Sequence, residues 1–188
     1  LSLLNTLVKE VDEHYNSYEP TRAGRAISDF VNDNLSNWYV RLNRKRFWGG
    51  EMNEDKLSAY QTLYTCLETV ALLMAPIAPF FSDRLFTDLT TATGRADKSV
   101  HLCNFPTLHE EIIDKELEER MHIAQDITSM VLALRRKVNI KVRQPLTTLM
   151  IPILDEYQKE HIEAVQELIL NEVNVKNLKF VDNAAGIL

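Results

Sequence analysis

The spacing of apolar residues constrains this fold most, because it follows a helical period over most of the chain and then changes. Up to about residue 140, apolar side chains recur every three or four residues, as on one face of an α-helix. After Pro145 the spacing becomes two, which is typical of β-strands. The chain is therefore predicted to be mainly α, with a helical bundle at residues 1–145 followed by a small α/β unit at residues 146–188.

The helices of the bundle are predicted from this spacing and from the prolines and glycines that separate them. Their expected ranges are 3–15, 20–48, 55–74, 79–89 and 112–138. Asp55 is the expected cap of the third helix. A long connection at 90–108 is expected to include a short extended piece at 100–102. The α/β unit is expected to contain a strand covered on both faces, a helix and a second strand, at 146–153, 156–170 and 175–181.

The formal net charge of −6 over 188 residues argues, at face value, against a nucleic-acid partner. The charge is segregated, however. Four cations lie within residues 41–46 and five within residues 135–143, and neither window contains an acid. The stretch Glu110–Glu119 holds six acids and one lysine. Because electrostatic fields decay within about 10 Å at ordinary salt, the local clusters matter more than the total.

The first basic cluster combines cations with an aromatic side chain. On a continuous helix Arg41, Arg44 and Trp48 stand at i, i+3 and i+7 and share a face. Guanidinium groups beside an indole offer phosphate contacts and a stacking surface, and this combination recognises single-stranded RNA loops. The alternative is a solvated helix end whose cations offset the negative end of the helix dipole. Trp38 and Tyr39 continue the apolar stripe and are expected in the core.

The second basic cluster ends the longest predicted helix and continues into an extended exit. Its members are Arg135, Arg136, Lys137, Lys141 and Arg143. Cations distributed along this length could follow a phosphate backbone at several points. Equally compatible with the sequence are helix-end electrostatics together with salt bridges to the acidic stretch Glu110–Glu119.

Signatures of catalysis, metal binding and membrane insertion are missing from the sequence. It has no glycine-rich phosphate loop, no G-x-S-x-G and no H-E-x-x-H, and its five histidines lack metal-ligand spacing. Cys66 and Cys103 are far apart, which suggests buried thiols in a reducing compartment. No segment approaches the roughly 18 apolar residues that span a bilayer. We therefore expect no catalytic centre and no metal site here. The start at Leu1 and the end soon after the last predicted strand suggest a segment of a longer protein.

Several strings resemble the class I aminoacyl-tRNA synthetases, in particular the isoleucyl-tRNA synthetases. They occur in family order and read FVNDNLSNWYVRLNRKRFW at 30–48, MAPIAPFFSD at 74–83, SVHLCNFP at 99–106, KVRQPL at 141–146 and NVKNLKF at 174–180. The second and third strings look common to the valyl and leucyl enzymes as well. The first and fourth look more particular to the isoleucyl enzymes.

The resemblance implies a helical domain that binds the anticodon stem and loop of an isoleucine tRNA, within a monomeric cytoplasmic enzyme. The catalytic and editing domains, with ATP and magnesium, would lie upstream on the same polypeptide, so no cofactor is expected in this chain. Carried onto this sequence, tRNA contacts are expected from Arg41, Arg44, Arg46, Trp48, Arg135, Arg136, Lys137, Lys141 and Arg143. The same domain of a valyl or leucyl enzyme and a helical protein-interaction adaptor are the alternatives.

Overall fold

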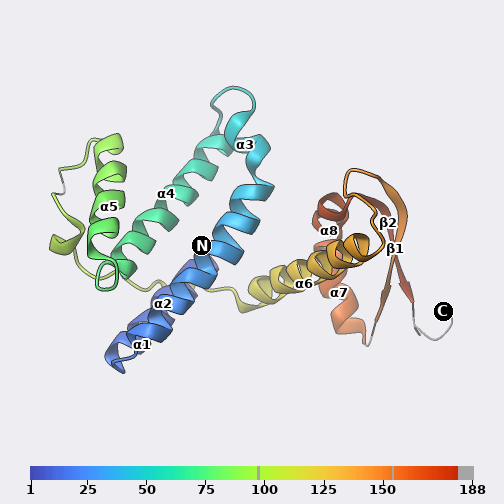
Figure 1. The fold of residues 1–188 in the computed structure, drawn as a ribbon, viewed down its shortest axis with the longest axis horizontal. Coiled ribbons are helices and arrows are strands. Elements are labelled where there is room, and N and C mark those ends of the chain that lie inside the picture. The colour runs from blue at the N-terminus through green and yellow to red at the C-terminus, as the bar shows by residue number, and fades with distance from the viewer. Residues whose placement is uncertain (97, 154, 182–188) are drawn as a thin grey trace. The chain divides into compact units, whose positions relative to one another are not determined.

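Helices make up most of the chain, as the apolar spacing predicts (Figure 1). The computed structural model describes residues 1–96, 98–153 and 155–181. Its contacts divide the chain into a first unit, Leu1–Ile113, and a second unit, Asp114–Leu188. The predicted fold class, mainly α with a small α/β unit, is confirmed.

The first unit contains helices and short helical turns throughout its length. Its elements are α1 (Ser2–Asn16), α2 (Pro20–Asp29), the π-helix η1 (Phe30–Val40), α3 (Arg44–Trp48), α4 (Glu54–Met74), α5 (Pro79–Thr93) and the 3₁₀ turns η2 (Val100–Leu102) and η3 (Glu110–Ile112). The prediction of an extended piece at 100–102 is wrong, because these residues form the 3₁₀ turn η2.

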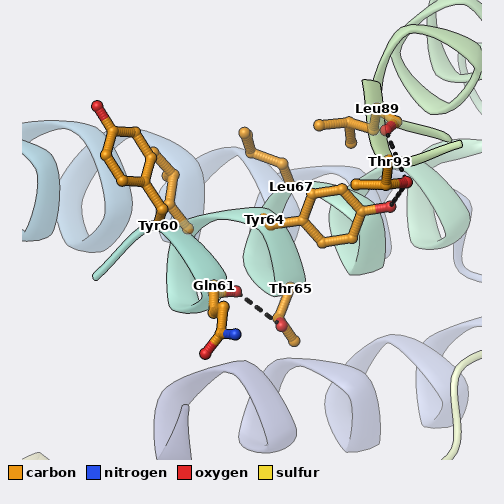
Figure 2. A pocket seen from close by; sticks show the side chains of 8 residues that line it. Tyr60, Gln61, Tyr64, Thr65, Leu67, Leu89 and Thr93 are labelled. Atoms are coloured by element: carbon orange, nitrogen blue, oxygen red, sulfur yellow. Dashed lines mark hydrogen bonds between the residues drawn. The ribbon is translucent and has the colours of Figure 1, made fainter. Parts of the chain in front are cut away.

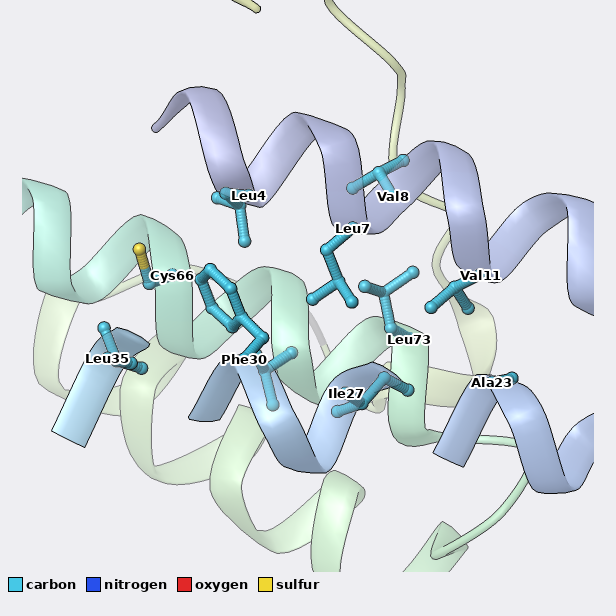
Figure 3. Packing of buried hydrophobic residues seen from close by; sticks show 11 residues of the cluster. Leu4, Leu7, Val8, Val11, Ala23, Ile27, Phe30, Leu35, Cys66 and Leu73 are labelled. Carbon is cyan, nitrogen blue, oxygen red and sulfur yellow. The ribbon is translucent and has the colours of Figure 1, made fainter. Parts of the chain in front are cut away.

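The core of the first unit lies between α1, α2, η1 and α4. Leu7, Ile27 and Leu73 come from three of these helices and point toward one another (Figure 3). Each fully buried side chain of this size stabilises the fold by about 1.5–3 kcal/mol. The tyrosine at the end of α1 adds a polar tie, since the Tyr15 hydroxyl donates to the Leu73 carbonyl at 2.7 Å.

The helix predicted over residues 20–48 is present but not continuous. Its backbone changes from α to π geometry at Phe30 and turns at Asn43, whose φ is −90° and ψ 10°. The Asn43 side-chain amide donates to the Tyr39 carbonyl at 2.8 Å and so satisfies an acceptor at this turn. After Gly50, which has a φ of +67°, the chain enters α4. Asn53 caps α4 in place of the predicted Asp55.

The segment after α5 is held to that helix by one carboxylate. Asp83 Oδ1 accepts from the Ser99 hydroxyl at 2.6 Å and from the Val100 amide at 3.0 Å. Val100 then packs with Phe86 and Ala71 in a small second cluster. Two of the strings that carry the family resemblance therefore meet in a structural contact.

The second unit joins a long helix to a crossover between parallel strands. Its elements are α6 (Lys115–Lys137), β1 (Leu146–Pro152), α7 (Glu156–Ala164), α8 (Gln166–Val173) and β2 (Val175–Val181). The strands pair in parallel, with Leu146 opposite Val175 and Pro152 opposite Val181. The helix predicted at 156–170 is two helices, which meet at Val165. The prediction that the first strand is covered on both faces is wrong, because Ile151 is the buried residue of β1.

The boundary between the units differs from the predicted one at residue 145. Helix α6 packs on α7 and α8, so it belongs with the strands. Its buried residues include Ala124, Ile127 and Thr128. Amphipathic spacing predicts that one face of this helix is buried, but it does not tell which neighbour covers that face.

Candidate nucleic-acid interface

The end of η1 combines buried aromatic side chains with a cation. Trp38 is 8% exposed, and the Tyr39 hydroxyl donates to the Ala59 carbonyl on α4 at 3.1 Å. These positions confirm the expectation that both residues belong mainly to the core. The Arg41 guanidinium carbon lies 5.9 Å from the centre of the Trp38 ring, within the range of a cation–π contact. Arg41 is half-buried and therefore anchored beside the core.

Arg46 already has partners within the protein, at its partly exposed surface. Its guanidinium donates to both carboxylate oxygens of Asp55, at 2.8 and 2.6 Å, and to the Asp55 carbonyl at 3.0 Å. A further bond reaches Asn43 Oδ1 at 2.8 Å. These bonds connect the turn at Asn43 to the start of α4, and the carboxylate offsets the charge of Arg46 locally.

The short helix α3 presents the exposed part of the first cluster. Arg44, Lys45 and Trp48 are exposed, with Trp48 at 74%. Phe47 is buried against Tyr60, with ring centres 5.1 Å apart, which fixes the helix on α4. Arg44 and Trp48 lie at i and i+4 on this helix, so a cation and an indole share one face. The spacing argument that joined Arg41 to the same face does not hold, because the chain turns at Asn43.

Lys45 is a cation that the prediction left out, although it stands between two predicted residues. Its exposure makes it a member of the same surface. The sequence alone could have placed Lys45 among the predicted tRNA contacts, because no acid lies between residues 41 and 46.

A separate groove of about 680 Å³ lies on the first unit between α4 and α5 (Figure 2). Tyr64 and Thr93 meet across it, with their hydroxyl oxygens 3.4 Å apart. Tyrosine, leucine and threonine side chains with one glutamine line the groove, and no member of the basic clusters does. The groove therefore offers apolar surface rather than positive charge.

In the second cluster, Arg135 does not lie where the prediction needs it. Its exposed fraction is 3%, and its guanidinium donates to the carbonyls of Lys141, Gln144 and Asn174, each at 3.1 Å. The Arg135 guanidinium already donates to three carbonyls and exposes little surface to a phosphate. This geometry argues against a direct tRNA contact from Arg135.

The other predicted cations of the second cluster face solvent. They are Arg136, Lys137, Lys141 and Arg143. Arg136 and Lys141 line a hollow of about 350 Å³ at the end of α6, together with Arg135 and with Leu132, Asn139, Ile140 and Val142. These four exposed cations are placed where a phosphate backbone could contact them.

The acids that could have neutralised the second cluster have partners elsewhere. In the first unit, Glu110 pairs with Lys9 at 3.1 Å and Glu111 with His109 at 2.9 Å. In the second unit, Glu116 pairs with Arg120, and Glu119 accepts from the Tyr157 hydroxyl at 2.9 Å. These four contacts weaken the alternative in which the basic cluster serves as partner for the acidic stretch.

The described part of the chain contains neither a group of metal ligands nor a membrane-spanning helix. Over residues 1–96, 98–153 and 155–181, no three histidine, cysteine or acidic side chains are grouped so that they could hold a metal ion. Within the same ranges, no helix has the length and apolarity needed to cross a membrane.

Comparisons with known proteins agree with the helical architecture. A sequence profile described as the anticodon-binding domain of tRNA ligase matches residues 1–151 and so includes both basic clusters. An isoleucine–tRNA ligase of Bacteroides thetaiotaomicron is 77% identical over 189 residues, covering 100% of this chain and 16% of that protein. An isoleucine–tRNA ligase of Porphyromonas gingivalis is 65% identical over 188 residues, covering 100% of this chain and 16% of that protein.

A more distant relative is the isoleucine–tRNA ligase of Clostridium tetani, 44% identical over 181 residues, with 96% of this chain and 17% of that protein covered. The chain thus spans 16–17% of the length of these curated relatives. These matches confirm the resemblance inferred from the sequence strings. Since the profile matches residues 1–151, which is most of the chain, the chain belongs to the family of anticodon-binding domains of tRNA ligases.

Proposed function

We propose that this chain binds the anticodon stem and loop of an isoleucine tRNA as part of an isoleucine–tRNA ligase. The profile match over residues 1–151 carries the proposal, and the names of the relatives supply the amino acid. The complete polypeptide would join isoleucine to tRNA with ATP and magnesium at domains outside this chain. The complete enzyme would be a monomer and would act in the cytoplasm.

The exposed cations and Trp48 would make the contacts. Arg44, with Lys45 beside it, would meet phosphates, and the Trp48 indole would stack on an unpaired base. Arg41 would contribute from the end of η1, where it lies over Trp38. In the second unit the phosphate contacts would come from Arg136, Lys137, Lys141 and Arg143.

The first test measures binding of the complete polypeptide to the isoleucine anticodon stem-loop and to an unrelated hairpin. Arg44→Ala is expected to lower affinity for the stem-loop several-fold, since each phosphate contact contributes to binding. Arg25→Ala removes a charge that is also exposed, on α2, and is the matched control. Equal affinity for both RNAs would favour a protein-interaction adaptor instead. Charging assays with isoleucine, valine and leucine distinguish the three related enzymes.

The second test uses the salt dependence of binding. Replacing Arg136, Lys141 and Arg143 together by glutamine is expected to flatten the log–log plot of affinity against salt by about 0.7–0.9 units for each phosphate that the variant no longer neutralises. An unchanged slope would show that this cluster does not meet phosphates.

A further inference from the structure

We infer that Arg135 is a positioning residue, which holds the loop of residues 138–145 in the shape that presents its cations to RNA. The inference rests on the proposed tRNA-binding role of those cations. It adds a residue that makes no RNA contact itself and on which the geometry of the contacting residues depends.

The backbone of Arg135 starts the loop by closing the end of α6. Asn139 has a φ of +57°, a left-handed conformation that asparagine tolerates better than most residues. The Ile140 amide donates back to the Arg135 carbonyl at 2.9 Å, and the Asn139 amide to the Arg136 carbonyl at 3.2 Å. This pair of bonds is the Schellman arrangement that ends many helices. The chain therefore changes direction at the end of α6, and Ile140 is bonded back to the Arg135 backbone.

The side chain of Arg135 then holds the rest of the loop. Its Nη1 donates to the Lys141 and Gln144 carbonyls, which lie on either side of Val142 and Arg143. Both bonds measure 3.1 Å. Because these carbonyls are fixed from the inside, the side chains of Lys141 and Arg143 are directed to solvent, where both are exposed.

The other end of the guanidinium joins the loop to the end of α8. Nη2 donates at 3.1 Å to the carbonyl of Asn174, the residue that ends α8 with a φ of +51°. The same carbonyl accepts from the Leu146 amide at 3.1 Å, where β1 begins. The Asn174 side chain adds a bond of 2.8 Å to the Val142 carbonyl. A positive group at a helix carboxyl end is also favoured by the helix dipole.

Arginine is the side chain that this site requires. The guanidinium is planar and presents several N–H donors in a fixed geometry, whereas lysine has one ammonium group on a flexible stem. A lysine at 135 would keep the charge but could not reach three carbonyls that lie in different directions. The loop would then lose its internal support while the number of cations in the protein stays the same.

The structural part of the test compares Arg135→Lys with Arg136→Lys in the complete polypeptide, using hydrogen exchange measured by mass spectrometry. The amides of Ile140, Gln144 and Leu146 are hydrogen-bonded within this arrangement. In Arg135→Lys their exchange is expected to speed up about tenfold or more, as local opening becomes easier. Arg136→Lys changes an exposed neighbour in the same way and is expected to leave exchange as in the wild type. Unchanged exchange in Arg135→Lys overturns the inference.

The functional part measures tRNA affinity across salt concentrations for the same Arg135→Lys protein. Affinity is expected to fall about fivefold or more and the salt slope to flatten, although no charge has been removed. A general loss of stability would not flatten the slope. If the triple glutamine variant at 136, 141 and 143 weakens binding but Arg135→Lys does not, the positioning role is wrong. If loop exchange rises in Arg135→Lys but neither variant affects binding, the proposed RNA contacts of this loop are wrong. The positioning role, which rests on those contacts, is then wrong as well.

A second variant keeps the test decisive if Arg135→Lys does not fold. Asn174→Gly removes the side-chain bond to the Val142 carbonyl, and glycine accepts the positive φ without strain. It is expected to raise exchange of the 140–146 amides by a smaller factor, about threefold, with a matching partial loss of slope. Wild-type exchange and wild-type slope in Asn174→Gly would overturn the inference.

Discussion

Neighbouring side chains of the first basic cluster have different surroundings and therefore different chemistry. Arg46 forms a two-pronged ion pair with Asp55, whereas Arg44 and Trp48 face solvent. A charge already paired with a carboxylate has less to gain from a phosphate than one that faces water. The cluster thus divides into a structural arginine and a surface available for binding.

Trp48 is the residue whose loss should affect binding and not folding. Trp48→Ala is expected to weaken tRNA binding by roughly 5- to 150-fold, because stacking on an aromatic side chain contributes about 1–3 kcal/mol per base. Its exposure of 74% means that the free energy of unfolding should change by less than about 0.5 kcal/mol. Fluorescence anisotropy with labelled stem-loop and urea denaturation measure the two quantities. Trp48→Phe should keep most of the affinity, and equal affinity in all three proteins would rule out stacking.

Loss of the Arg46 side chain should affect folding stability. Arg46→Ala and Asp55→Ala are each expected to lower the free energy of unfolding by about 1 kcal/mol, since each removes the same partly exposed ion pair. The double variant should cost less than the sum of the two single variants, because the interaction can be removed only once. Urea denaturation of the four proteins measures this coupling. Strict additivity would show that the pair contributes nothing.

The surroundings of a single side chain can be predicted from the sequence when they depend only on the spacing of residues within one helix or strand. The burial of Trp38 follows from its place in the apolar stripe. The pairing of Arg46 does not follow, because Asp55 meets it only after the chain turns through Gly49–Gly50 and starts α4. Likewise, Arg135 and Arg136 are adjacent and chemically identical, and only the path of the loop decides which is buried.

Among the elements, the apolar spacing predicts the helices well but not their internal geometry. The apolar stripe over residues 20–48 predicts helical structure, and the segment is helical. The backbone changes from α to π geometry at Phe30, which shifts each hydrogen bond by one residue, yet Phe30, Leu35 and Trp38 of the predicted stripe are buried. The spacing of apolar residues therefore cannot distinguish the two. The predicted face shared by Arg41 and Trp48 is wrong because of the turn at Asn43, which lies between them.

The contact between α5 and the segment after it should depend on pH. Hydrogen bonds from the Ser99 hydroxyl and the Val100 amide lower the pKa of Asp83. A folded-state pKa below the unfolded value, about 3.9, stabilises the fold above that pH, and this contribution is lost as the pH falls through the folded-state value. The fall in unfolding temperature caused by Asp83→Ala should therefore be full at pH 7 and smaller at pH 3.

Thermal unfolding of the wild type, Asp83→Ala and Asp88→Ala at pH 7, 5 and 3 measures this dependence. Asp88 is an exposed acid on the same helix, paired with Arg84 at 2.9 Å, and serves as control. If the loss in Asp83→Ala is as large at pH 3 as at pH 7, the charge of Asp83 does not support the contact.

For the whole molecule, the division into units decides which cations belong together. Helix α6 packs with α7 and α8, so the second basic cluster lies in the same unit as the strands. The predicted boundary at 145 would have cut the chain between Arg135 and its acceptor Asn174. Sequence patterns do not reveal this, because a contact between residues 39 positions apart depends on tertiary packing.

Two fragments test the boundary. Residues 114–188 are expected to keep helical circular dichroism and to unfold cooperatively on heating, since α6 and the Arg135 contacts are retained. Residues 146–188 lose the helix that covers α7 and α8 and should not unfold cooperatively. A cooperative transition in the shorter fragment at the same temperature would support the domain boundary at 145 that the sequence predicts.

The burial of Arg135 beside the exposed Arg136 also has a consequence for natural variation. Three carbonyl acceptors in a buried site tolerate only a guanidinium, whereas an exposed cation can be exchanged for another cation such as lysine at little cost. Across related tRNA ligases, position 135 should remain arginine while position 136 drifts. Two identical neighbours are thus expected to evolve at different rates, one constrained by the shape of a loop and the other only by the charge of a surface.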